Sequence, residues 1–544
     1  MSLSGIGVSP GVVVGTVHQI LHVEVTEPIP GNAEKVIAAL QVVAADLEQR
    51  AEQASLEVAR EVLSAQAMIA QDPSLEEAIQ ASITGDVADV RPGIHQAFEG
   101  FRNALLSLGG YFAERVADLD EIANRAILKL SGLETSDVEL TKPSIVVAQD
   151  LTPADTAALD LNFALALVVE KGGPTSHTAI VARGLGIPAI VGCSGILQVA
   201  LDEQILVDGR EGVVILSPSD EEIKMRQLVE IEKKSRANSV TGPGRFSDGS
   251  LIQLLGNAGN ENDARKALDA GAEGIGLFRT ELLFLDRQTE PSVDEQVDMY
   301  CKVFDVMAGK KVILRTLDAG SDKPVPFLNT VDEENPALGV RGWRLTRIAN
   351  DVIDRQLEAV GKAAAKTSAD VWVMAPMIDT PDEAADFAQR ARAHGIKKVG
   401  VMIETPAAAL MADRILEEVD FASLGTNDLT QYVMAADRLD SRLSDLTSSW
   451  HPAVLRAIQQ AAASAAIYGK QIGVCGEAAA NPQLAAVLLG LGVSSLSMAP
   501  VAIGEVRGYL AGIDLGACHK AAHAAINARS AEQAREQVHA ILGD

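Results

Sequence analysis

Apolar and polar positions alternate over short stretches at the start of the chain, as in strands, and roughly the next hundred residues have the longer spacing of helices. The segment GIGVSPGVVVGTVHQI at residues 5–20 predicts β-branched strands around glycine turns. Residues 24–130 are rich in Ala, Leu, Glu and Gln, which favour helices, and Asp72-Pro73 predicts a break between two of them. Strand-like runs return at SIVVAQD, ALALVVE, IPAIVG, QILVDG and GVVILSP. Strand-forming regions are therefore expected on both sides of a helical one.

These patterns divide the chain into four expected parts. Because the first strands have no sheet of their own, residues 1–23 and 133–218 are expected to form one small α/β domain. Residues 24–132 are expected to be a helical insertion within it. The charged run DEEIKMRQLVEIEKKSRA, closed by TGPG, predicts an interdomain linker helix over 219–245. The last part, 246–544, follows a different pattern.

Residues 246–544 alternate between strand-like and helical runs. The strand-like runs are LIQLLGNAG, GIGLFRTE, KVILRTLD, VWVMAPMI, KVGVMIET, FASLGTND, QIGVCGEA and SSLSMAP. Eight such units in about 300 residues predict a closed (β/α)8 TIM barrel. The expected fold class is therefore multidomain α/β, with the barrel at the C-terminal end.

Composition narrows the class of protein. The 544 residues are 47% hydrophobic and carry a formal charge of -28, which disfavours nucleic acid as a partner. The four cysteines form no CxxC pair, so we expect neither a disulfide framework nor a zinc site, and a reducing cytoplasm fits best. The start of the chain lacks a secretion-signal pattern, and polar residues interrupt the longest uncharged stretch, 478–504, so no membrane span is expected.

Polar and reactive residues gather at the predicted strand ends of the barrel, where such folds build their active sites. These residues are Asn257, Arg279, Glu281, Arg315, Asp318, Glu404, Asn427, Asp428 and Cys475. Glu404 and Asp428 would end the fifth and sixth strands, and a carboxylate pair with room for water suits Mg²⁺. The alternative is a surface ion pair for Glu404 and a helix cap for Asp428.

A group of cations accompanies these carboxylates. Their guanidinium and ammonium groups suit a small anion that bears phosphate and carboxylate groups, although each alone could be a surface residue. The group consists of Arg279, Arg315, Arg341, Arg438 and Lys323. Cys475 is either a buried structural cysteine or a proton donor to an enolate carbon.

The segment KGGPTSHTAIVARGLGIPAIVG at residues 171–192 places His177 at the start of a predicted helix. A neutral imidazole can accept a phosphoryl group, and the helix N-terminus would favour the resulting anion. Ser176 and Thr178 could add hydroxyl donors. The alternative is a capping or packing histidine.

Several long motifs together resemble the phosphoenolpyruvate-utilising enzymes. The histidine segment resembles the phosphohistidine motif of that family, and GIGLFRTELLFLDR, ENPALGVRGWRL, GVMIETPAAAL, FASLGTNDLTQYVMAADR and GVCGEAA resemble its barrel motifs. The order and lengths of the parts are similar to those of its phosphoenolpyruvate-protein phosphotransferase (Enzyme I) branch. This resemblance covers nearly the whole chain.

The resemblance implies an activity and a set of roles. His177 would take the phosphoryl group of phosphoenolpyruvate and pass it to the small phosphocarrier protein HPr, in a homodimer whose histidine domain swivels. Thr156 would orient His177, and Cys475 would protonate the enolpyruvate carbon. Glu404 and Asp428 would hold Mg²⁺. The implied phosphoenolpyruvate contacts are Arg279, Arg315, Asn427 and Arg438. Arg341 is implied as a further contact, although the second arginine of GVRGWRL could take that role instead.

Two other functions compete with this interpretation. Pyruvate phosphate dikinase and phosphoenolpyruvate synthase share the histidine motif and the barrel but carry a nucleotide-binding domain, whereas no GxxxxGK loop occurs here. A non-catalytic regulator would be expected to lack His177, Cys475 or the carboxylate pair. The helical insertion matches the family only loosely. Over residues 24–90 it contains thirteen Asp and Glu but only three Lys and Arg. This acidic surface is either a solvated helix face or a docking surface for a basic partner.

Overall fold

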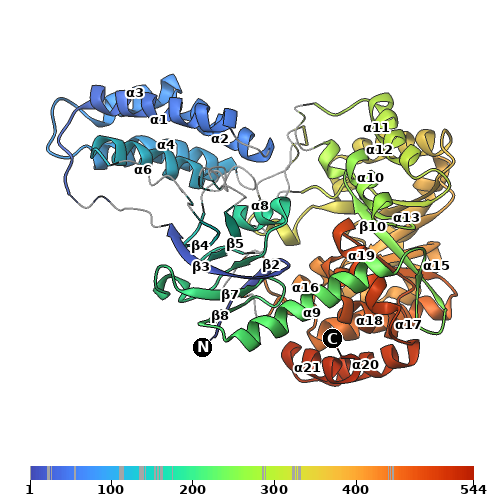
Figure 1. Cartoon of the computed structure of the whole chain (residues 1–544). Coiled ribbons are helices and arrows are strands. Elements are labelled where there is room, and N and C mark those ends of the chain that lie inside the picture. The colour runs from blue at the N-terminus through green and yellow to red at the C-terminus, as the bar shows by residue number, and fades with distance from the viewer. Residues whose placement is uncertain are drawn as a thin grey trace. The chain divides into compact units, whose positions relative to one another are not determined.

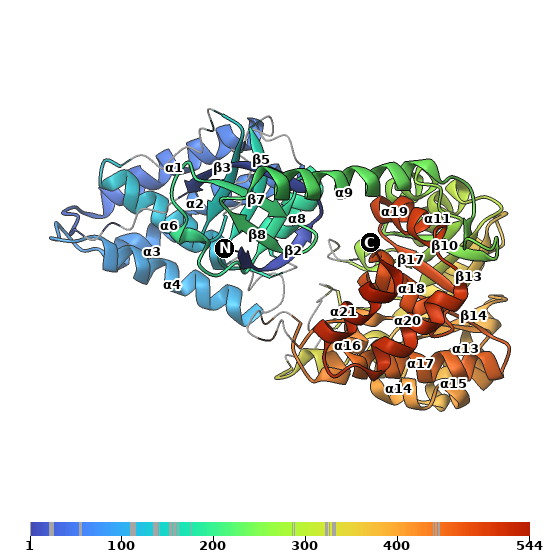
Figure 2. The same ribbon diagram turned by 60° about the horizontal axis from the view of Figure 1, so that its bottom comes forward.

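The chain divides into two units, Met1–Ile231 and Glu232–Asp544, whose elements are labelled in Figures 1 and 2. The computed structural model describes residues 2–20, 25, 27–53, 57–108, 116–133, 140, 142–151, 155, 159, 163–173, 176–284, 287, 289–320, 325, 327–328, 333–438, 440, 443 and 446–543.

An eight-stranded sheet organises the first unit, in the order β1-β8-β7-β3-β4-β5-β6-β2. Its strands are β1 (Ser2–Ser4), β2 (Ile6–Ser9), β3 (Val12–Ile20), β4 (Ser144–Ala148), β5 (Ala164–Val169), β6 (Ala189–Val191), β7 (Gln204–Asp208) and β8 (Val213–Leu216). Only Gly5 separates β1 from β2 although they occupy opposite ends of this order, so the sheet curls round on itself. A Cβ atom on Gly5 would lie 2.7 Å from the carbonyl oxygen of Val191, so this position requires glycine.

Helices separate β3 from β4 along the sequence, although the two strands are parallel neighbours in the sheet. They are α1 (Ala33–Gln53), α2 (Glu57–Ala70), α3 (Pro73–Ser82), α4 (Arg91–Leu108) and α6 (Val116–Leu130). These helices bury a core of their own that includes Leu40, Ile79 and Phe98. The predicted break is observed at Asp72, which caps α3 by accepting the N–H of Ser74.

Two further helices complete this part of the chain. Helix α8 (His177–Leu185) follows β5, begins at the N-cap Ser176 and ends at Gly186, whose φ of 69° closes the helix in the left-handed region. Helix α9 (Asp220–Ser239) follows β8, and the boundary between the two units falls within it. Gly244 and Arg245, at the end of the predicted linker, form the short strand β9 and pair with the barrel, so these two residues belong to the barrel sheet.

Eight parallel strands close into a barrel in the second unit. They are β10 (Leu251–Ala258), β11 (Gly274–Arg279), β12 (Lys311–Arg315), β13 (Asp370–Ala375), β14 (Val399–Ile403), β15 (Phe421–Leu424), β16 (Gln471–Val474) and β17 (Ser495–Met498). Closure is complete because β10 pairs with both β11 and β17. The predicted (β/α)8 barrel is confirmed, and each strand forms within one of the eight apolar runs except β13, which begins one residue earlier, at Asp370.

Helices surround this barrel (Figure 2). They are α10 (Glu261–Asp269), α11 (Val293–Val306), α12 (Asn350–Ala364), α13 (Pro381–Ala393), α14 (Pro406–Leu410), α15 (Ala412–Glu418), α16 (Thr426–Met434), α17 (Pro452–Ile467), α18 (Pro482–Gly490), α19 (Pro500–Leu510), α20 (Leu515–Asn527) and α21 (Ala531–Leu542). A large apolar core fills the space between strands and helices, and a smaller buried cluster lies among the strands and contains Met402 and Cys475. Among the described helices, none has both the length and the apolar character needed to cross a membrane.

Candidate active site

The carboxyl ends of the barrel strands bring together charged side chains that are far apart in the sequence. Arg279 ends β11 and Arg315 ends β12, and the two residues are register partners on adjacent strands. Glu404 follows β14, and Asp428 lies in the first turn of α16, which follows β15. Parallel strands end at the same rim of a barrel, so these residues share one mouth.

Asp318 lies at the centre of the buried charges of this mouth. Its side chain is 0% exposed and its carboxylate pairs with two guanidinium groups, Arg315 at 3.2 Å and Arg341 at 3.0 Å. Arg315 pairs in addition with Glu281 at 3.0 Å, and Glu281 accepts the backbone N–H of Asp318. Buried charges are tolerated when they are paired and hydrogen-bonded, and each charge of this cluster is paired, although Nε of Arg315 has no hydrogen-bond partner among the described residues.

Arg341 links Asp318 to the opposite side of the mouth. Its Nη1 lies 3.0 Å from Oδ1 of Asp428, and its side chain is 1% exposed. The second arginine of GVRGWRL, Arg344, instead pairs with Asp379. Of the two arginines that competed for a place in the site, the structure therefore brings Arg341 to the carboxylates.

Glu404 is buried beside other carboxylates. Its Oε2 accepts the backbone N–H of Met377 at 2.9 Å, and Met377 has a φ of 55°, a strained conformation for a residue with a side chain. Burial, reinforced by the negative charges of Asp428 and Asp318, raises the pKa of Glu404 to about 7. A cation beside Glu404 would relieve this repulsion.

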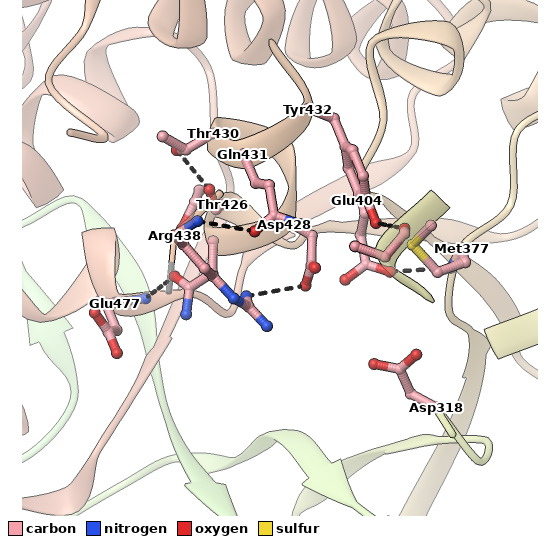
Figure 3. A network of polar contacts seen from close by, with 12 residues as sticks. Asp318, Met377, Glu404, Thr426, Asp428, Thr430, Gln431, Tyr432, Arg438 and Glu477 are labelled. Carbon is pink, nitrogen blue, oxygen red and sulfur yellow. Dashed lines mark hydrogen bonds and ion pairs between the residues drawn. The ribbon is translucent and has the colours of Figure 1, made fainter. Parts of the chain in front are cut away.

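Figure 3 shows how the residues around Asp428 converge. Arg438 approaches Asp428 at 3.5 Å, and its own backbone N–H donates to Gln431 at 3.2 Å. Asn427 accepts the backbone N–H of Glu477 at 3.2 Å, which joins the loop after β16 to the start of α16. Arg341 bridges the carboxylates of Asp318 and Asp428, at 3.0 Å from each.

Cys475 follows β16 and is 3% exposed. Its Sγ lies 3.7 Å from the carbonyl oxygen of Leu424, and its own carbonyl accepts a hydrogen bond from Asn257. Burial and then the charge of Glu404 raise the pKa of the Cys475 thiol to about 12. The thiol therefore keeps its proton at neutral pH, as a proton donor must.

The candidate nucleophile lies in the other unit. His177 is the first residue of α8, and the Ser176 hydroxyl next to it accepts the N–H of Ala179. The Thr178 hydroxyl is buried and donates to Asp150 at 3.3 Å. Two predicted site residues, Thr156 and Lys323, lie outside the described residues.

Sequence reasoning gave no role to several residues that the structure places in or behind the site. Asp318 and Glu281 were visible at strand ends, but nothing in the sequence paired them with particular arginines. Tyr432 lies within 3.5 Å of Arg341, and Gln356 accepts the backbone N–H of Leu317 from a buried position on α12.

Comparison with known proteins agrees with this geometry. The PEP-binding domain of the PEP-utilising enzymes matches residues 233–515, their mobile domain matches 140–212 and their N-terminal domain matches 4–115. The chain is similar to proteins named phosphoenolpyruvate-protein phosphotransferase, with 44% identity to one from Streptomyces coelicolor over 99% of each chain. Another from Haloferax volcanii is 39% identical over 83% of this chain and 82% of its own, and one from Listeria monocytogenes is 33% identical over 98% of each. The chain therefore belongs to the PEP-utilising enzymes and, within them, to the phosphoenolpyruvate-protein phosphotransferases.

Proposed function

We propose that the chain transfers the phosphoryl group of phosphoenolpyruvate to its own His177 and then to the histidine of HPr, releasing pyruvate in the first step of sugar uptake by the phosphotransferase system. The observation that carries this proposal is the convergence of Arg315, Arg341 and Arg438 on the carboxylates at the barrel mouth. Each of these guanidinium groups pairs with a carboxylate here, and a small ligand that bears several negative charges would take the place of these carboxylates as its partner.

In the first half-reaction the bond between phosphorus and the enol oxygen breaks, and a bond between phosphorus and an imidazole nitrogen of His177 forms. The arginines, with Arg279 and Asn427 at the same strand ends, hold the phosphate and carboxylate groups. Cys475 then gives its thiol proton to the methylene carbon, which yields pyruvate. Its raised pKa supports this role, because the proton stays on sulfur until a strongly basic carbon accepts it.

Glu404 and Asp428 are the proposed Mg²⁺ ligands. Their oxygen donors suit this ion, and burial, together with the negative charges of Asp428 and Asp318, raises the pKa of Glu404, which a bound cation would lower again. No group of three or more His, Cys, Asp or Glu side chains able to hold a metal occurs among the described residues, so water and substrate oxygens would complete the shell. Bound Mg²⁺ would act as a Lewis acid on the phosphoryl oxygens.

In the second half-reaction HPr is the proposed acceptor. The relatives' name specifies a protein acceptor, and the helices α1 to α3 lie within residues 24–90, where thirteen Asp and Glu outnumber three Lys and Arg and suit a basic partner. Met68 in α2 is 69% exposed and offers an apolar contact within that region. His177 and the barrel belong to different units, so a swivelling motion of the histidine unit would let one histidine serve both partners.

A homodimer formed through the barrel is also proposed. Leu410 in α14 and Ile467 in α17 are 70% and 79% exposed on helices that contact each other. Light scattering should give twice the chain mass, and Leu410→Asp with Ile467→Asp should lower it. A wild-type monomer at micromolar concentration would contradict the dimer. We place the reaction in the cytoplasm, where the free cysteines would remain reduced.

The proposal is tested by incubating the chain with phosphoenolpyruvate and Mg²⁺ without ATP. We expect pyruvate in an amount equal to the protein and an acid-labile phosphate on His177. The His177→Ala variant should bind phosphoenolpyruvate and release no pyruvate, while His18→Ala in β3 should behave as the parent does. Release of pyruvate by His177→Ala, or loss of its phosphoenolpyruvate binding, would contradict the division of labour between the two units.

A further inference from the structure

A continuous chain of buried polar side chains runs behind the arginines of the barrel mouth. It begins at the backbone of β12, passes through Thr280 and Gln356, and continues through Tyr300 and Gln296. It ends at the carbonyl oxygen of Pro291, which Gln296 contacts at 3.0 Å. The side chains come from α11 and α12, which lie side by side, and from the end of β11 (Figure 1).

Gln356 is the branching point of this chain. Its Oε1 accepts the backbone N–H of Leu317 at 2.9 Å, and its Nε2 donates to the Thr280 hydroxyl at 3.1 Å and the Tyr300 hydroxyl at 3.2 Å. The Thr280 hydroxyl in turn donates to the carbonyl oxygen of Arg315 at 2.9 Å. Because a backbone N–H can only donate, these contacts set the orientation of the Gln356 amide.

The four polar side chains, those of Thr280, Gln356, Tyr300 and Gln296, are all 0% exposed. A hydrogen bond in such a low-dielectric setting is stronger than one in water, and leaving one of its groups unpaired is costly. Within this network the Gln356 amide donates two hydrogen bonds through Nε2 and accepts one through Oε1. A shorter or apolar side chain at 356 would leave several buried groups without partners.

These polar side chains hold two backbone groups, the carbonyl of Arg315 and the N–H of Leu317. Both groups lie beside the charged centre of the site. The backbone after β12 carries Arg315 and, three residues later, Asp318, which pair with Glu281 and Arg341. Strand pairing extends only to the N–H of Thr316, which donates to Met374. Beyond that point the backbone of Leu317 is held by Gln356 instead of by a neighbouring strand.

We propose that Gln356 and Thr280 are positioning residues for substrate binding, which hold the 315–318 segment so that Arg315, oriented by its ion pair with Asp318, presents a preformed anion site. They act through the backbone and do not touch the ligand. This inference rests on the proposed function, because it assumes that phosphoenolpyruvate binds at the barrel mouth.

The test measures the dissociation constant of phosphoenolpyruvate by calorimetry on the full chain carrying His177→Ala, with Mg²⁺ present, so that binding occurs without turnover. Gln356→Met and Thr280→Val remove the hydrogen bonds while keeping side-chain size. Thr280→Ser keeps the hydroxyl. Gln296→Met removes equally buried hydrogen bonds at the far end of the chain, none of which reaches the 315–318 segment.

We expect Gln356→Met and Thr280→Val to weaken binding by about tenfold, the scale seen when groups that orient a ligand's contacts are removed. In the chain with His177 intact, KM for phosphoenolpyruvate should rise more than kcat falls. Thr280→Ser and Gln296→Met should stay within about twofold of the parent in affinity, although Gln296→Met should lower the thermal midpoint as Gln356→Met does.

Two results overturn the inference. Unchanged affinity in the two hydrogen-bond deletions would show that the 315–318 segment needs no such support. Equal weakening by Thr280→Ser and Thr280→Val would show that the methyl group of Thr280 matters instead of its hydroxyl. If the His177→Ala parent itself binds no phosphoenolpyruvate, the proposed function fails, and this inference fails with it. If the parent binds phosphoenolpyruvate, either of the two results above contradicts only the positioning role of Gln356 and Thr280.

Discussion

Arg341 and Asp428 form a buried ion pair, with 3.0 Å between Nη1 and Oδ1 and exposed side-chain fractions of 1% and 9%. The sequence assigned them to different ligands, Arg341 to phosphoenolpyruvate and Asp428 to Mg²⁺. Their contact shows that the residues of the proposed anion site and of the proposed cation site belong to one network. A change at either residue should therefore affect both ligands.

Replacing Arg341 should weaken substrate binding. Arg341→Met removes a buried cation that pairs with two carboxylates, and we expect the phosphoenolpyruvate dissociation constant to rise by about 10- to 100-fold. Calorimetry in the His177→Ala background measures this change. Arg344→Met is the matched control, because Arg344 lies three residues away and pairs with Asp379 instead. Equal effects of the two changes would contradict the assignment.

Glu404→Gln should abolish tight binding of the metal. The change removes one of two proposed carboxylate ligands and leaves the fold of the barrel in place. Binding of Mn²⁺, as a spectroscopic substitute for Mg²⁺, can be followed by electron paramagnetic resonance in the absence of substrate. Glu477→Gln, at an exposed position near the same mouth, is the control and should bind normally. Normal Mn²⁺ affinity in Glu404→Gln would contradict the proposed ligand set.

The Cys475 thiol should resist alkylation at neutral pH. Its raised pKa of about 12 keeps sulfur protonated, and iodoacetamide reacts with the thiolate. The rate of modification at Cys475, followed by mass spectrometry in the native chain, should therefore be slow at pH 7 and keep rising through pH 10. A rate that levels off near pH 8 would show an ordinary thiol. Cys301, which is only partly buried, provides an internal comparison.

The ion pair between Asp89 and Arg91 should stabilise the helical insertion except in acid. Hydrogen bonds from Arg91 lower the pKa of Asp89 from 3.8 to about 2, so the ionised carboxylate favours the folded state. This contribution is present above pH 3.8 and is lost as pH falls from 3.8 toward 2. Because the pair is partly solvent-exposed, we expect Arg91→Gln to lower the free energy of unfolding only slightly at pH 7.

Urea unfolding monitored by circular dichroism at pH 7 and pH 3 tests this effect. The tryptophans at 343, 372 and 450 all belong to the barrel unit, so fluorescence reports its unfolding separately. Arg50→Gln, which breaks an exposed pair with Asp46 on α1, is the control. A destabilisation by Arg91→Gln that is as large at pH 3 as at pH 7 would contradict the electrostatic explanation.

The barrel was predictable because its signal is local. Each strand is a short apolar run bounded by turns or helices, and a polar or reactive residue at the end of most runs marks the mouth. The partners within the mouth were not predictable in this way. Arg341 contacts Asp428 across 87 positions of sequence and is almost fully buried, although a lone arginine in a loop is usually exposed.

The polar chain behind the mouth illustrates the same limit. Gln356 and Gln296 lie on helices among apolar residues, and composition alone cannot show that their amides meet Tyr300 and Thr280. Such contacts depend on helix packing, which sequence periodicity leaves undetermined. The end of the predicted linker shows a smaller effect, because the glycine signal of TGPG concealed the two-residue strand β9.

The central claim is that one histidine passes a phosphoryl group from phosphoenolpyruvate to a carrier protein. The most direct measurement charges the purified chain with labelled phosphoenolpyruvate and Mg²⁺, removes the excess, adds HPr and follows the label over time. We predict acid-labile label on His177 that moves to HPr and none on the His177→Ala variant. Label that stays on the chain would contradict the proposed acceptor, and absence of label would favour a regulatory protein that binds phosphoenolpyruvate without phosphotransfer.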